Sequence, residues 1–197
     1  MRTSRRKTSA VYTDFTKELS ALVRWDADNQ KAFSAEVGRR PAGRISKRQL
    51  HALSESTFFR AFRAYENFVR ELFILYCQEK PTIDNHSVKS YLRPRSFSHA
   101  EELIRSSMRF TDWNDPEVMI RRSDLFLIGG FPVRDVYTTN KKTFDDMKVL
   151  RNHIAHRSVE SFKAYRRMLQ RHLKTQPLHT PEPGEFLLFT DAADSTK

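Results

Sequence analysis

The sequence has one cysteine, Cys77, so it forms no internal disulfide and suits a reducing compartment. No run approaches the ~18 apolar residues of a membrane span, and no apolar stretch follows the basic N-terminus, so we expect neither a membrane anchor nor a secretory signal. Only 5 Gly and 8 Pro argue against collagen-like, low-complexity and many-turned all-β chains. We therefore expect a soluble, cytoplasmic protein.

Positive charge and aromatic side chains are abundant instead. The 197 residues include 35 Lys and Arg against 24 Asp and Glu, which gives a net charge of +11. A hydrophobic content of 39%, with 12% aromatic residues, is too high for a disordered chain. The composition predicts a packed domain whose surface favours polyanions.

Apolar residues recur at three- and four-residue steps through most of the chain, which indicates helices. The strongest stripe runs to about Lys80, where Pro81 stops it, and it starts after a capping-box pair, Ser46 and Gln49. This stripe comprises Phe58, Phe62, Tyr65, Val69, Leu72 and Tyr76. Further helix starts are predicted by capping residues at Ser98, Asp115, Thr143 and Ser158.

Three segments follow from these patterns. Residues 1–10 carry a net +4 and are predicted to form a flexible basic arm, residues 11–175 a helical domain, and residues 176–197 an acidic tail. Pro181, Pro183 and Gly184 are expected to prevent further helix there, leaving a short strand or apolar clip over residues 185–190. The predicted fold is an all-α bundle of five or six helices with two tails.

Most enzyme signatures are missing from the sequence. It has no GxGxxG, Walker A, GxSxG or HExxH motif. His153 and His156 have a spacing that offers two metal ligands, but a zinc site needs three or four from the protein. Because Cys77 is distant and no acidic cluster adjoins the pair, we expect no metal and no cofactor.

The segment 150–157 concentrates polar chemistry. Asn152 and His156 share a helix face, whereas Arg151 and His156 are about 140° apart and converge only if the helix ends or bends there, or if the arginine reaches across. A histidine exchanges protons with a ribose 2′-hydroxyl near neutral pH, and an arginine holds a phosphate. The alternative is that these residues form a basic helix end, whose cations interact favourably with the helix dipole.

Arg-Asn-His-Ile-Ala-His, at residues 151–156, resembles the Arg-x4–6-His motif of the HEPN superfamily, and residues 64–72 resemble its earlier long helix. The resemblance covers about residues 45–175. It implies a homodimer in which two motifs form one cleft, cutting single-stranded RNA without metal to leave a 2′,3′-cyclic phosphate. It assigns proton transfer to His156, phosphate binding to Arg151 and positioning to Asn152.

Glu66 lies on or beside the apolar stripe, where an unpaired carboxylate is costly. The resemblance pairs Glu66 with Arg151 and adds it to the catalytic set. The equally weighted alternative is a local pair with Arg63 or Arg70, one helical turn away.

Residues 141–174 hold ten Lys and Arg against three acids, a net +7 around the motif. Lys148, Arg157 and Arg70 are the expected RNA-binding cations. His153 is either a second imidazole at the cleft or, the favoured choice, a helix-surface residue. Trp25 and Trp113 are the aromatic residues expected to be most exposed for base stacking.

Three functions remain open at this point. The first is a HEPN-type endoribonuclease acting as a toxin or antiphage effector, with RNA, a second copy and a cognate antitoxin or regulatory protein as partners. Ser158 stands where toxins silenced by AMP transfer carry a tyrosine, which argues against that control. The second is a non-catalytic HEPN module for dimerisation and nucleic-acid binding, and the third a basic helical DNA-binding protein.

Overall fold

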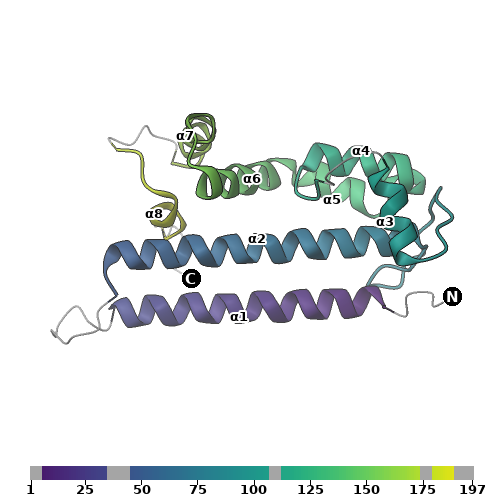
Figure 1. Cartoon of the computed structure of the whole chain (residues 1–197), viewed down its shortest axis with the longest axis horizontal. Helices are drawn as coiled ribbons and strands as arrows, with labels where there is room; N and C mark the ends of the chain where they lie inside the picture. Colours follow the sequence, from purple (N-terminus) through teal and green to yellow (C-terminus); the bar gives the residue numbers. More distant parts are fainter. Residues whose placement is uncertain (1–5, 35–44, 107–111, 174–178, 189–197) are drawn as a thin grey trace. The chain divides into compact units, whose positions relative to one another are not determined.

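The computed structural model describes residues 6–34, 45–106, 112–173 and 179–188. These residues form helices and no strand, which confirms the predicted all-α class (Figure 1). The helices are α1 (Thr8–Ser34), α2 (Lys47–Cys77), α3 (Phe97–Arg105), α4 (Pro116–Phe126), the 3-10 helix η1 (Ile128–Gly130), α5 (Val133–Thr139), α6 (Lys141–His156), α7 (Val159–Leu173) and α8 (Pro183–Leu187). None of the described helices is long and apolar enough to cross a membrane.

The chain divides into two compact units. Unit 1 comprises Met1–Glu18 and Arg63–Lys148, and unit 2 comprises Leu19–Phe62 and Val149–Lys197. Helices α1, α2 and α6 each contribute residues to both.

Unit 1 is built around an aromatic core on the C-terminal half of α2. Phe73 and Met119 are almost fully buried, and Phe15 of α1 stacks on Phe68 with ring centroids 4.2 Å apart. Trp113 is also buried, 5.8 Å from the ring of Phe73 and under the guanidinium of Arg122. The expectation of an exposed Trp113 is therefore wrong, because the indole packs into this core.

Local capping sets the helix starts of unit 1. Asp115 accepts hydrogen bonds from the backbone N–H groups of Glu117 and Val118, so the predicted start of α4 is confirmed. The cap of α3 is Ser96, which accepts from His99, rather than Ser98. The predicted cap Thr143 lies inside α6, which begins at Lys141.

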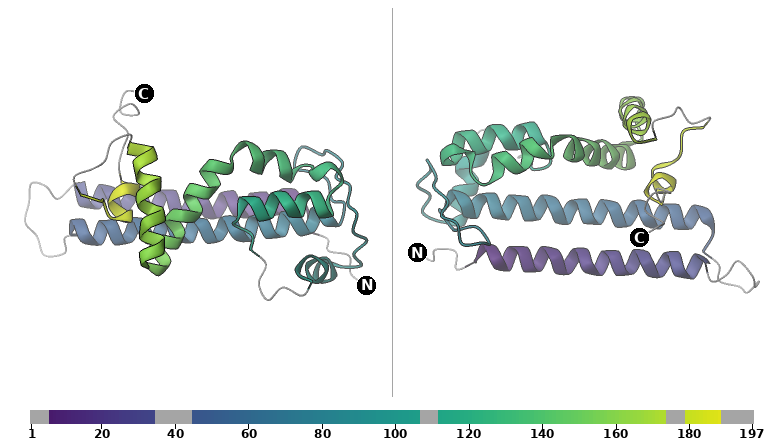
Figure 2. Two further views of the ribbon diagram at one scale, coloured as in Figure 1. Left: turned by 90° about the horizontal axis from the view of Figure 1, so that it is seen from above. Right: turned by 180° about the vertical axis from the view of Figure 1, so that it is seen from behind.

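The sequence pattern missed α5, which has only seven residues. Two glycines with positive φ, Gly129 and Gly130, link α4 to α5 through η1 and let the chain reverse there. The two helices pack side by side in both views of Figure 2.

At the N-terminus, α1 begins at Thr8, inside the segment expected to be a flexible arm. Arg6 pairs with Asp14 at 3.2 Å and with Glu71 at 2.8 Å, so residues 6–10 are held by unit 1. Residues 1–5 lie outside the described part of the chain.

Unit 2 is organised by a smaller core under α7. Tyr165, Met168 and Leu169 are buried together with Leu150 of α6. Ser158 accepts from the backbone N–H of Ser161, which confirms it as the cap of α7. The remaining apolar side chains packed against this core are Phe58, Val149, Ile154, Leu173, Phe186 and Leu187.

Unit 2 also packs the N-terminal half of α2 against the C-terminal helix α8. Ser46 and Gln49 form the predicted capping box in both directions, at 2.8 and 3.2 Å. Pro183 starts α8, so the expectation that the prolines prevent helix is wrong; proline is tolerated in a first helical turn because its missing N–H needs no partner there. Gly184 is buried so close to α2 that a Cβ would lie 2.3 Å from the carbonyl oxygen of His51.

Candidate functional site

The Arg-x4-His motif lies on the last turns of α6, within unit 2. Arg151 is half-buried, and its Nη1 donates to the Oδ1 of Asn152 at 3.0 Å. Its guanidinium carbon lies 5.6 Å from the ring centroid of Phe59 on α2. The Nε of Arg151 is buried and has no hydrogen-bond partner among the described residues. The guanidinium is thus oriented by Asn152 and Phe59 and retains an unused donor.

His156 is the last residue of α6, and its side chain is exposed. The next residue, Arg157, has φ +45°, which ends the helix, although left-handed backbone is unusual for a residue other than glycine. The helix therefore ends directly after the histidine, so Arg151 and His156 both lie within α6, and their convergence depends on the arginine side chain reaching across. No hydrogen bond joins the His156 imidazole to another described residue.

His153 is enclosed in the core of unit 2 with 8% of its surface exposed. Its ring stacks on Tyr165 at 4.7 Å between centroids, and its Nδ1 lies 3.1 Å from the Oγ of Ser161. Burial, and secondarily the nearby charge of Arg157, lower the pKa of His153 below the ordinary value. The expectation of a helix-surface residue is wrong, and a neutral, packed imidazole is poorly placed to contact RNA.

The expected RNA-binding residue Arg157 is tied to α2. Its Nη2 donates to the Oε2 of Glu55 at 2.9 Å, while the Oε1 of Glu55 accepts from the backbone N–H of Gly184 at 3.1 Å. Glu55 is buried and was missed by the sequence reading. Glu55 lies seven residues before Phe62 and so falls on the apolar stripe of α2, and this position is the sequence signal that indicates its burial.

Lys148 and Arg70, the other expected RNA-binding cations, belong to unit 1 and are both in ion pairs. Lys148 binds Asp115 and lies 3.9 Å from Asp112. Arg70 binds Glu101 through two nitrogens, at 2.5 and 2.7 Å. Contact with RNA would compete with these carboxylates.

Glu66, also in unit 1, accepts a hydrogen bond from the side-chain amide of Asn114. Neither sequence alternative for its partner included this asparagine. The suggested pair of Glu66 with Arg151 joins residues of different units and stays a prediction.

Exposed cations gather on α7 instead. Lys163, Arg166 and Arg167 are exposed, and their spacing puts them on one side of the helix. None of the three has an ion-pair partner among the described residues. Phe162, one residue before Lys163, is 40% exposed. This set, the α7 basic face, combines phosphate-binding charge with a ring that a base can stack on.

Metal-ligating side chains do not cluster in the described parts of either unit. No group of three or more His, Cys, Asp or Glu residues there is arranged to hold a metal ion.

Comparisons of the chain with protein-family models, with curated proteins and with solved structures found no match.

Proposed function

We propose that this chain is a metal-independent endoribonuclease of the HEPN type, which acts on single-stranded RNA as a homodimer. The observation that carries the proposal is the placement of Arg151, Asn152 and His156 together on the last turns of α6, with the guanidinium oriented and the imidazole exposed. A role as a toxin or antiphage effector, restrained by a partner protein, belongs to the same proposal.

In the proposed reaction the imidazole of His156 takes the proton of a ribose 2′-hydroxyl. The 2′-oxygen attacks the adjacent phosphorus, and the bond from phosphorus to the 5′-oxygen breaks. The 5′-oxygen leaves with a proton from an imidazolium, which the second copy of the motif supplies in a dimer. The products are a 2′,3′-cyclic phosphate and a 5′-hydroxyl, with no net consumption of water.

Arg151 is suited to the charge that develops on the phosphate. Its Nη1 donates to Asn152, which fixes the plane of the guanidinium, and the side chain as a whole is only half-buried. A guanidinium that is already oriented and partly desolvated loses little on binding an anion, so it favours the transition state. Asn152 is in this scheme a positioning residue.

The α7 basic face provides the binding surface of the proposal. Its three cations are available without breaking an internal ion pair, unlike Lys148, Arg70 and Arg157. We therefore expect RNA affinity to depend more on α7 than on those three predicted contacts. Binding by exposed cations releases counterions, so affinity falls steeply as salt rises.

The test is cleavage of a fluorescent single-stranded RNA by purified protein in EDTA. Wild type is expected to leave 2′,3′-cyclic phosphate ends, and His156→Ala to slow cleavage by about 10²- to 10⁴-fold, the usual contribution of a general acid–base. Arg151→Lys keeps the charge but loses the planar fork, so it is also expected to be slow. The matched control is His86→Ala, which removes an exposed histidine of unit 1.

Intact RNA after incubation with wild type would refute the nuclease proposal, as would cleavage by His156→Ala at the rate of His86→Ala. Cleavage that requires added divalent metal would point to a different chemistry.

A second candidate is a nucleic-acid-binding module without catalysis. It is favoured by the absence, within the described residues, of any side chain that hydrogen-bonds and orients the His156 imidazole. This function predicts salt-sensitive RNA binding that is reduced by substitutions in α7, with no cleavage by any variant.

A further inference from the structure

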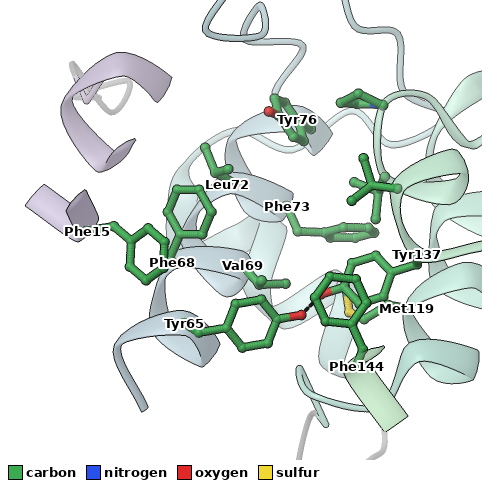
Figure 3. A pocket seen from close by; sticks show the side chains of 13 residues that line it. Phe15, Tyr65, Phe68, Val69, Leu72, Phe73, Tyr76, Met119, Tyr137 and Phe144 are labelled. Carbon is green, nitrogen blue, oxygen red and sulfur yellow. Dashed lines mark hydrogen bonds between the residues drawn. The ribbon is translucent and has the colours of Figure 1, made fainter. Parts of the chain in front are cut away.

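Unit 1 contains an apolar cavity of about 360 Å³ (Figure 3). It is bounded by side chains of α1, α2, α4, α5 and α6, all from unit 1. The lining residues are Phe15, Tyr65, Phe68, Val69, Leu72, Phe73, Tyr76, Met119, Pro132, Val133, Val136, Tyr137 and Phe144. None of these side chains carries a charge.

The cavity extends from the surface into the core. Phe73 and Met119, in its wall, are 1% and 0% exposed, whereas Val136 is 52% exposed. Val136 therefore marks the mouth, and the inner end reaches fully buried side chains. A space of this size and depth in an apolar wall is typical of a small-molecule site.

Two hydroxyl groups meet in the wall of the cavity. The Oη atoms of Tyr65 and Tyr137 are 2.6 Å apart, and Phe144 packs against both rings (Figure 3). Burial raises the pKa of Tyr65 to about 12, so the hydroxyl stays protonated at neutral pH. The pair is a neutral hydrogen-bonding group in an otherwise apolar space.

We propose that this cavity binds a small, uncharged, largely apolar molecule whose single hydrogen-bonding group lies beside the Tyr65–Tyr137 hydroxyl pair. A carboxylate or phosphate ligand does not fit, because the lining offers no cation to replace its lost hydration.

The test uses Nile red, an uncharged apolar dye with a carbonyl group, and the full-length chain. Trp113 lies against the cavity-lining Phe73, so the Trp25→Phe variant leaves one indole that reports on the cavity. Nile red is expected to bind at one site per chain, brightening as it leaves water and quenching Trp113 by energy transfer.

The matched variants place the same ring at two exposed valines. Val136→Phe fills the mouth and is expected to weaken dye binding at least tenfold. Val159→Phe adds the same area on α7, where Val159 is 65% exposed, and is expected to leave dye binding unchanged. Equal binding by both variants, or no saturable binding by wild type, would overturn the proposal.

Competition distinguishes the class of ligand. The alcohol 1-decanol is expected to displace the dye at a concentration at least tenfold lower than decanoate at pH 8. Equal displacement would overturn the assignment of an uncharged ligand. Dye that is lost as protein concentration rises, with dimers in sedimentation, would identify the occupant as a second copy and overturn the proposal too. None of these outcomes depends on RNA cleavage.

Discussion

The two units of this chain differ in net charge and in whether the cations singled out above are paired. Unit 1 has nineteen Lys and Arg against fifteen acids, and unit 2 sixteen against nine. In unit 1, Lys148, Arg70 and Arg93 are each held by a carboxylate, whereas the α7 basic face of unit 2 has none among its described neighbours. The net charge counts paired and unpaired cations equally, but a polyanion binds mainly to the unpaired ones.

The interiors differ as well. Unit 1 encloses an uncharged cavity and a thiol, although it also buries the charged side chains of Arg122 and Asp146. Unit 2 encloses the imidazole of His153 against Ser161 and the carboxylate of Glu55, which accepts from Gly184. We therefore expect unit 1 to respond to apolar ligands and unit 2 to pH, salt and polyanions.

The largest expected effect concerns the thiol of unit 1. Burial raises the pKa of Cys77 to about 12, which lowers its thiolate fraction about a thousandfold relative to an ordinary thiol. In the Val159→Cys variant, mass spectrometry after iodoacetamide at pH 8 should find alkylation at position 159 and almost none at Cys77. Comparable rates at both positions in the native protein would show that the unit 1 core is open.

The next-largest effect is expected from glycine substitutions, one in each unit, which should destabilise the two units to different extents. Gly184→Ala puts a Cβ into the backbone of His51, so we expect unit 2 to lose about 2 kcal/mol of unfolding free energy. Gly129→Ala has open space but φ +67°, and should cost unit 1 about 1 kcal/mol. Urea denaturation of both variants measures this, and a harmless Gly184→Ala would contradict the close approach of α8 to α2.

Removing cations from each unit sharpens the charge comparison. Arg166→Ala with Arg167→Ala should weaken single-stranded RNA binding about tenfold and lower the slope of log affinity against log salt by about 1.4. The control pair is Arg93→Ala with Arg134→Ala, whose guanidinium groups already bind Glu79 and Asp124. Equal losses in the two double variants would show that paired and unpaired cations contribute alike.

The smallest expected effect is a pH dependence of unit 2. Because the pKa of His153 is lower in the folded state, the unfolded chain binds more protons below about pH 6.5, and stability falls as pH falls through that range. Glu55 opposes this shift and Arg157 supports it. Denaturation between pH 7.5 and 5 should show a smaller loss for His153→Gln than for wild type, and the same loss in both would exclude His153 as its source.

Capping chemistry made much of the fold predictable. Ser46 with Gln49, Asp115 with Pro116, and Ser158 were identified from residue types alone, because each satisfies backbone N–H groups within its own helical turn. The α3 cap was missed by two residues, since Ser96 and Ser98 both offer a hydroxyl and only the backbone conformation decides between them. Helices α5 and α8 are too short to show a period.

The helix that carries the candidate site residues could be predicted from the sequence, but the long-range contacts around them could not. The motif residues Arg151, Asn152 and His156 stand where the pattern predicts, on the last turns of a helix. The contacts of Arg157 with Glu55 join residues 102 positions apart, and no local pattern indicates them. Burial of His153 likewise depends on α7 folding over it through Tyr165.

The left-handed backbone of Arg157 has a consequence for how this sequence can vary. Glycine would adopt φ +45° without strain, so on local grounds Arg157→Gly is favourable. It would also remove the tether from the end of α6 to Glu55, leaving a buried carboxylate short of a donor. Two structural demands therefore meet at position 157, an easy bend of the backbone and a contact with a distant carboxylate, and arginine satisfies the second.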